Sequence, residues 1–176
     1  MITLNEFENF LYTDLVYEQK IVSVIDDQHR QILIENIRQL HDYTNCTIKL
    51  EQMEKYNEGI FEKCQELRTK YSHPGPVTCH AFLAFKGSKS FGVHTDPDDV
   101  IIECIFGSKT LYVATKNDRR HVLKQGEYIF IPANTEHEII NEEKSLILSF
   151  GFEKFYTEKL KLNYGIDVLP QDDRNL

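Results

Sequence analysis

The sequence has no apolar stretch long enough to cross a membrane, and it is poor in basic residues. No segment approaches the roughly 18 apolar residues that a transmembrane helix needs, and residues 1–15 carry acids where a secretion signal has basic and apolar regions. The chain has 20 Lys and Arg against 28 Asp and Glu, a formal net charge of −8. Because an acidic chain repels phosphate backbones, we predict a cytoplasmic protein that binds neither membranes nor nucleic acid.

The four cysteines form no Cys-x-x-Cys pair: they stand apart as Cys46, Cys64, Cys79 and Cys104. This scatter disfavours a disulfide framework or a thiolate zinc site, and we expect reduced, buried packing residues. The sequence also lacks internal repeats and low-complexity segments. Its 176 residues, 41% of them hydrophobic, predict one globular domain over residues 1–176, as a monomer or a homodimer.

The N-terminal part, residues 1–75, has helical periodicity. Apolar residues recur at steps of three or four within residues 26–43, where Asp26 or Asp27 can act as the N-cap. The same spacing continues through residues 47–71 and stops at a segment that contains two prolines, residues 73–76. The pattern predicts two or three N-terminal helices.

The pattern changes after residue 76 to short runs of β-branched and aromatic residues, separated by turn-forming clusters. Runs at this spacing, without helices between them, predict an antiparallel sandwich or barrel over residues 76–152. A short closing helix is expected within residues 153–163, followed by a loose tail to residue 176. The predicted strands are 78–86, 100–106, 110–115, 127–132, 138–141 and 145–152.

Residues that can bind a metal stand at two places in this second part. His94 and Asp96 are two residues apart, so on an extended backbone their side chains share one face. One more imidazole completes a 2-His-1-carboxylate triad, which leaves open coordination positions for other ligands. His137, in a strand-turn-strand segment, is the candidate for that third ligand.

The segment around His137 resembles the second sequence motif of the cupin superfamily. Gly126, Pro132, His137 and Asn141 stand at the motif's spacing, and Asn134 replaces a glycine that the motif prefers. Asparagine tolerates the left-handed backbone that glycine would supply. The resemblance implies a mainly β fold, a double-stranded β-helix or jelly-roll barrel, preceded by the N-terminal helices.

Residues 94–112 resemble the iron-binding core of JmjC-type oxygenases, in particular the asparaginyl-hydroxylase and ribosomal-oxygenase branches. This resemblance, which covers residues 78–152, implies Fe(II) bound by the triad and 2-oxoglutarate as cosubstrate, with Lys109 paired to its distal carboxylate. Relatives often place a hydroxyl three residues before the first metal ligand, where this chain has Phe91. Residues that can compensate are Thr78, His80, Ser88 and Ser149, of which Thr78 and Ser149 are the candidate cosubstrate ligands.

Three functions stay open at this point. The first is a dioxygenase that hydroxylates a protein side chain or a small molecule. The second is a metal-dependent cupin isomerase or dioxygenase that does not use 2-oxoglutarate, and the third is a non-catalytic module that binds a ligand. Asp96 favours the oxygenase over dioxygenases with three histidines, and Lys109 favours a cosubstrate that carries a carboxylate. Asp98 and Asp99 form either a solvated turn or an acidic rim that attracts a basic substrate.

Overall fold

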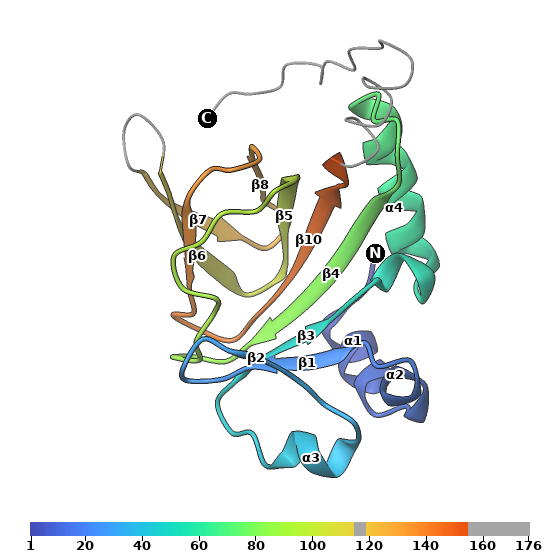
Figure 1. The fold of residues 1–176 in the computed structure, drawn as a ribbon, viewed down its shortest axis with the longest axis vertical. Helices are drawn as coiled ribbons and strands as arrows, with labels where there is room; N and C mark the ends of the chain where they lie inside the picture. The colour runs from blue at the N-terminus through green and yellow to red at the C-terminus, as the bar shows by residue number, and fades with distance from the viewer. Residues whose placement is uncertain (115–118, 155–176) are drawn as a thin grey trace.

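The fold of this chain is seen in a computed structural model that describes residues 1–114 and 119–154 (Figure 1). Its helical elements are α1 (Leu4–Leu11), α2 (Asp14–Glu18), α3 (Ile37–His41), the 3₁₀ turn η1 (Met53–Lys55) and α4 (Glu58–Lys70). Its strands are β1 (Val22–Ile25), β2 (Gln31–Leu33), β3 (Thr47–Leu50), β4 (Val77–Ala84), β5 (Asp99–Phe106), β6 (Ser108–Val113), β7 (Arg119–Lys124), β8 (Tyr128–Ile131), β9 (His137–Ile140) and β10 (Ser145–Phe152).

The strands form two sheets, and every strand pair in them is antiparallel. The large sheet has the order β2-β1-β3-β4-β10-β5-β8, and the small sheet has the order β7-β6-β9. In Figure 1 the small sheet faces the β4-β10-β5 part of the large sheet, and α4 covers the opposite side of β4. The prediction of a mainly β, antiparallel fold with a few N-terminal helices is confirmed. Within the described ranges, no helix is long and apolar enough to cross a membrane.

Alternation along the central strands separates a packed face from a face that lines a cavity. On β4, Cys79 and Leu83 are buried in the larger core, together with residues of α4. Thr78, His80 and Phe82, one step out of phase, line the cavity between the sheets. The same alternation on β10 buries Leu146, Leu148 and Phe150 and turns Ile147, Ser149 and Gly151 toward the cavity. The period-2 rule therefore decides which side chains reach the site.

The prediction of helix over residues 26–43 is wrong for most of that range. The Asp26 carboxylate accepts hydrogen bonds from the backbone N–H groups of Gln28 and Arg30, both at 2.9 Å, so it closes a tight turn where an N-cap was expected. The chain then reverses, and β2 pairs with the buried strand β1. Tertiary pairing with this apolar strand overrides the helical spacing, and helix is found only in α3.

The helix predicted over residues 47–71 is shorter at its N-terminal end. The first four residues of the predicted range form a strand instead: they are β3, which is buried between β1 and β4. Gln52 has a left-handed backbone, with φ of 56°, and this breaks the chain between β3 and the helical part. The helix α4 begins after Asn57, whose side chain accepts the N–H of Ile60 at 3.0 Å, and it ends before the predicted proline stop.

All six predicted strands of the second part are present, with small changes at their ends. The strand β7 was missed because its sequence, RRHVLK, is rich in basic residues; as an edge of the small sheet it can carry them. The four cysteines are free and buried, as predicted. The closing helix predicted within 153–163, like the tail to residue 176, lies outside the described residues from 155 onward.

Candidate metal and cosubstrate site

The two histidines of the predicted triad are held next to each other by backbone hydrogen bonds. His94, in the connection between β4 and β5, forms an isolated antiparallel bridge with His137, the first residue of β9. The N–H of His94 donates to the carbonyl of His137 at 3.0 Å, and the reverse bond measures 2.9 Å. The N–H of Asn134 donates to the carbonyl of Asp96 at 2.7 Å. Asn134 has a φ of 60°, the left-handed backbone expected of it.

Both imidazoles are oriented by a second backbone contact. Nδ1 of His94 lies 2.8 Å from the carbonyl oxygen of Gly92, and Nδ1 of His137 lies 2.9 Å from that of Thr135. A carbonyl oxygen can only accept, so each Nδ1 carries the proton and each Nε2 keeps a free lone pair. This is the arrangement in which histidines coordinate a metal through Nε2.

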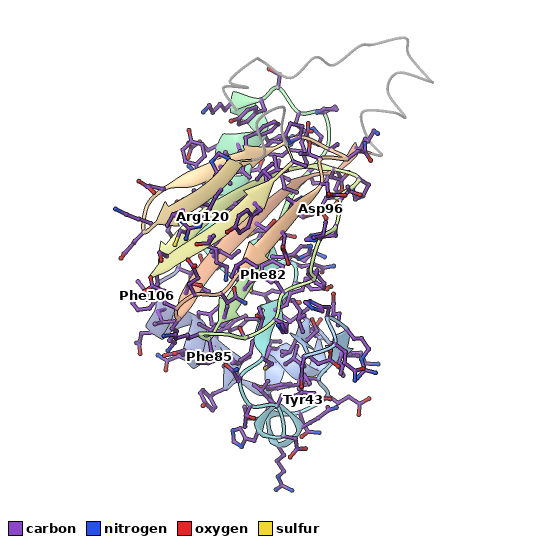
Figure 2. The ribbon with its side chains drawn as sticks, turned by 90° about the vertical axis from the view of Figure 1, so that its left-hand side faces the viewer. Tyr43, Phe82, Phe85, Asp96, Phe106 and Arg120 are labelled. Atoms are coloured by element: carbon purple, nitrogen blue, oxygen red, sulfur yellow. The ribbon has the colours of Figure 1, made fainter. Side chains whose placement is uncertain are left out.

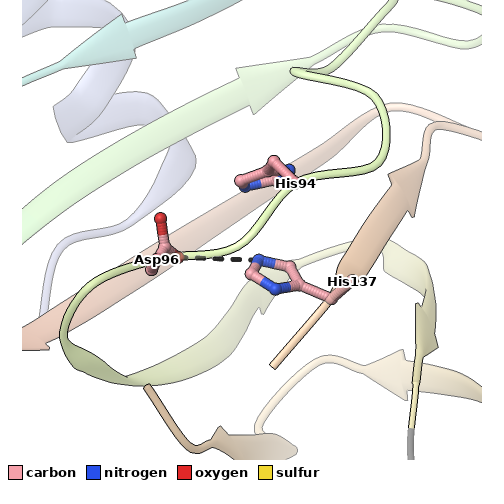
Figure 3. Close-up of side chains that lie close together, drawn as sticks. All are labelled: His94, Asp96 and His137. Carbon is pink, nitrogen blue, oxygen red and sulfur yellow. Dashed lines mark ion pairs between the residues drawn. The ribbon is translucent and has the colours of Figure 1, made fainter. Parts of the chain in front are cut away.

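Asp96 completes the set (Figure 3). Its Oδ2 lies 3.6 Å from Nε2 of His137, and the candidate ligand atoms of His94, Asp96 and His137 all lie within 4.8 Å of one another. Ligands at adjacent positions of a metal, with bonds of about 2.1 Å at right angles, lie about 3 Å apart, so a small closure brings these atoms to a shared ion. Two neutral imidazoles and one carboxylate fit a divalent transition metal.

Lys109 lies at the inner end of the same cavity, on β6, and only 2% of its surface is exposed. Its Nζ donates to Oδ1 of Asn141 at 2.5 Å and to Oγ of Ser145 at 3.1 Å. No carboxylate within residues 1–114 or 119–154 forms an ion pair with it. Burial lowers the pKa of Lys109 to about 7, because a desolvated ammonium without a counterion is disfavoured. An anion bound beside Nζ would restore the charge.

The cavity that joins these groups has a volume of about 510 Å³, within the range of small-molecule sites. The metal ligands lie on the small-sheet side, and β3, β4, β5 and β10 supply the opposite wall. Figure 2 shows Phe82 and Asp96 in the barrel part of the molecule, far from Tyr43 among the N-terminal elements.

Comparison with protein families and solved structures agrees with this geometry. Residues 82–150 match the family model of the cupin domain. The barrel has the cupin fold. No curated protein sequence matches the chain, so relatives beyond the family model come from structure.

The cupin fold of this chain is similar to that of YcfD, a ribosomal oxygenase from Escherichia coli. The YcfD structure with cobalt and succinic acid aligns with a TM-score of 0.65 at 16% identity, over 99% of this chain and 52% of YcfD. The structure with cobalt and 2-oxoglutarate gives 0.63 at 17% identity, with the same coverage. A conserved protein of unknown function from Streptococcus pyogenes aligns over 44% of this chain and 64% of its own, at 19% identity and a TM-score of 0.40. The chain thus spans about half the length of the ribosomal oxygenase, and the likeness to it shows the fold.

The other residues singled out in the sequence have different places in the cupin barrel. Thr78 and Ser149 line the cavity, but the groups that touch Lys109 are Asn141 and Ser145; a contact of Thr78 or Ser149 with a cosubstrate stays a prediction. Ser88 belongs to the Asn141 network: the Asn141 amide donates to Ser88 and to the hydroxyl of Thr47.

The acidic residues near the cavity mouth are engaged in backbone contacts. Oδ1 of Asp98 accepts the N–H of Lys154 at 2.6 Å, and Oδ1 of Asp99 accepts the N–H of Ala133 at 2.7 Å. These hydrogen bonds connect both carboxylates to neighbouring backbone at the cavity mouth. Glu103 is not in the metal group. It is one step out of phase with Ile102, which lines the cavity from β5, and burial raises its pKa.

Two contributors to the site were missed in the sequence. Lys49 lines the cavity from β3, and assigning this strand to a helix hid the face on which it lies. His29, in the β1-β2 turn, donates from Nδ1 to the carbonyl of Ser90 at 2.6 Å, and the Ser90 hydroxyl donates to the carbonyl of Ile139 at 2.8 Å. Ser90, in the segment that leads to His94, is therefore hydrogen-bonded both to the β1-β2 turn and to β9.

Proposed function

We propose that this cupin is an Fe(II)- and 2-oxoglutarate-dependent oxygenase that hydroxylates a small molecule or a protein side chain. The observation that carries the proposal is the shared cavity: a 2-His-1-carboxylate group opens into the same space as a buried lysine that has no carboxylate partner among the described residues. The metal group supports a redox-active divalent ion, and the lysine supports an acidic cosubstrate.

Three residues would bind the metal. His94, Asp96 and His137 would hold the metal, with the two imidazoles fixed by the carbonyls of Gly92 and Thr135. Bound iron would supply the activation of O₂, by which 2-oxoglutarate is oxidised to succinate and CO₂ and one oxygen atom enters the substrate.

Lys109 would bind the distal carboxylate of 2-oxoglutarate. Two of its three donors are used by Asn141 and Ser145, which leaves one N–H for a ligand in the cavity. Asn141, fixed by its own amide contacts to Ser88, would hold Nζ of Lys109 in place through its Oδ1. The apolar cavity wall at Ile102 and Ile147 would exclude water from the reacting atoms.

The test is the slow conversion of 2-oxoglutarate to succinate in the absence of a substrate. Purified chain loaded anaerobically with Fe(II) is exposed to air with 2-oxoglutarate, and succinate is measured for wild type, His94→Ala and Lys109→Ala. We expect succinate from wild type, and a loss of activity in both variants. Metal binding without any affinity for 2-oxoglutarate would favour a cupin isomerase or a different dioxygenase, and absence of metal binding would favour a non-catalytic cupin.

A further inference from the structure

The cavity contains a second set of polar side chains that neither the metal nor Lys109 uses. His80 and Thr78 reach it from β4, Ser149 from β10 and Lys49 from β3. All four lie on the wall of the large sheet, opposite the small sheet that carries His137. These polar side chains are available to bind a further ligand.

The strand register separates His80 and Ser149 from the groups that touch Lys109, and Lys49, which pairs with Phe82, lies between the two levels. His80 pairs with Ser149, whereas Ser145, which touches Lys109, pairs with Ala84, four residues further along both strands. At about 3.3 Å per residue the two levels are about 13 Å apart. A five-carbon dicarboxylate anchored on Lys109 spans about 7 Å, the length of two extended residues. The level of His80 therefore stays free for another ligand.

His80 presents a hydrogen-bond donor to this space. Its side chain forms no hydrogen bond within the described residues, and its Nδ1 is buried without a partner. Because buried N–H groups are left unpaired less often than buried acceptors, the proton is assigned to Nε2 and not to the buried, unpartnered Nδ1. Burial, assisted by the charge of Lys49, lowers the pKa of His80 to about 4, so at neutral pH the ring is an uncharged donor.

Lys49 adds a positive charge next to His80. Its Nζ lies 2.8 Å from Oε1 of Glu51 and 5.8 and 5.9 Å from the ring centroids of Phe91 and Phe82. A divalent metal would balance the carboxylates of Asp96 and Asp98, which both line the cavity. At His80 itself the charge of Lys49 has a larger effect than that of Glu51 or Asp96. The wall at His80 thus offers hydrogen-bond donors next to a positive charge, which disfavours an amine or guanidinium there.

We infer that the end of the cavity away from Lys109, where Thr78, His80 and Ser149 lie with Lys49 at its boundary, binds the primary substrate through a carboxylate group. The inference rests on the proposed function, since it takes a divalent metal to be bound by His94, Asp96 and His137 and 2-oxoglutarate to occupy the end of the cavity at Lys109. It assigns Thr78 and Ser149 to the substrate, where the sequence resemblance suggested the cosubstrate. The substrate is accordingly a small carboxylic acid, placed between the metal and β4.

The test uses benzoate and benzylamine, which have the same ring but opposite charge, as probes of the Co(II)-loaded chain. Binding is measured by calorimetry for wild type, His80→Leu, His80→Gln and the control His41→Leu, which replaces an exposed histidine of α3 outside the cavity; the visible Co(II) spectrum reports direct ligation. We expect benzoate to bind wild type and His80→Gln, whose amide N–H can replace Nε2. Binding should weaken at least about tenfold in His80→Leu, as for loss of a hydrogen bond to a charged group, and stay unchanged in His41→Leu. Benzylamine should not bind.

Several results would overturn the inference: no benzoate binding to wild type, binding insensitive to His80→Leu, binding lost equally in His41→Leu, or tighter binding of benzylamine. Lys49→Met provides a second variant should His80→Leu not fold, and it should weaken benzoate to a similar degree. The affinity for 2-oxoglutarate, measured separately in the same proteins, reports on the proposed function. If the chain binds benzoate but does not bind 2-oxoglutarate, the proposed function is refuted while the carboxylate subsite stands.

Discussion

Binding of 2-oxoglutarate should take up a proton at Lys109. Burial without a counterion lowers the pKa of Lys109 to about 7 in the free protein, and a carboxylate beside Nζ would raise it again. At pH 8 about 0.9 of the free protein carries neutral Lys109, so about 0.9 proton should be bound per molecule of 2-oxoglutarate; at pH 6 the uptake should be about 0.1. The apparent affinity should fall about tenfold for each pH unit above 7.

Calorimetry in buffers of different ionisation enthalpy measures this uptake directly. The chain is loaded with Co(II), so that the cosubstrate binds without being consumed, and is titrated with 2-oxoglutarate at pH 6 and pH 8. Lys109→Arg is the matched control, because a guanidinium stays protonated and should bind without proton uptake. Equal uptake at the two pH values in wild type would refute the assignment of Lys109 as the buried, titrating anchor of the cosubstrate.

Other perturbations test the metal group and the fold. Asp96→Ala should lower Co(II) affinity at least about tenfold, since one of three ligands is lost; affinity equal to wild type by equilibrium dialysis would contradict the triad. His29→Leu should lower the Co(II) affinity several-fold. The loss should be smaller than the roughly 10–100-fold seen when a group bonded directly to a metal ligand is removed, because His29 acts through Ser90. An unchanged affinity would mean that the β1-β2 turn does not position the metal ligands. Gly107→Ala should lower the free energy of unfolding by more than about 2 kcal/mol, because φ is 72° and the new Cβ would overlap the Lys144 carbonyl oxygen. Gly126→Ala, with φ of 84° and open space around it, is the control and should cost about 1–2 kcal/mol in urea unfolding; equal costs would exclude the overlap as the cause.

The second half of the chain was predictable because its strands alternate. Along β4 and β10, apolar residues at every second position predict one packed face, and the other face carries Thr78, His80 and Ser149 into the cavity. His94 and Asp96 were readable as a pair because their spacing of two fits an extended backbone. Their meeting with His137, 41 residues beyond Asp96, depends on long-range pairing; His137 was a candidate from the triad's need for a third ligand, and the resemblance to a family supported it.

The N-terminal part was less predictable because its strands are short and fully buried. A strand such as β1, whose four residues are all buried, has no alternation that distinguishes it from part of a helix. The error had consequences for the site, since β3 supplies Lys49 and Thr47 to the cavity wall. The contact of His29 with Ser90 depends on a turn that brings together residues 61 positions apart, and no local pattern indicates it.

The most direct measurement of the central claim is the fate of oxygen in the turnover of 2-oxoglutarate. The Fe(II)-loaded chain is incubated with 2-oxoglutarate under ¹⁸O₂, and the succinate is analysed by mass spectrometry. We expect succinate that carries one ¹⁸O atom, formed at a rate that depends on His137 and Lys109. Unlabelled succinate, or labelled succinate formed equally well by His137→Ala, would contradict it.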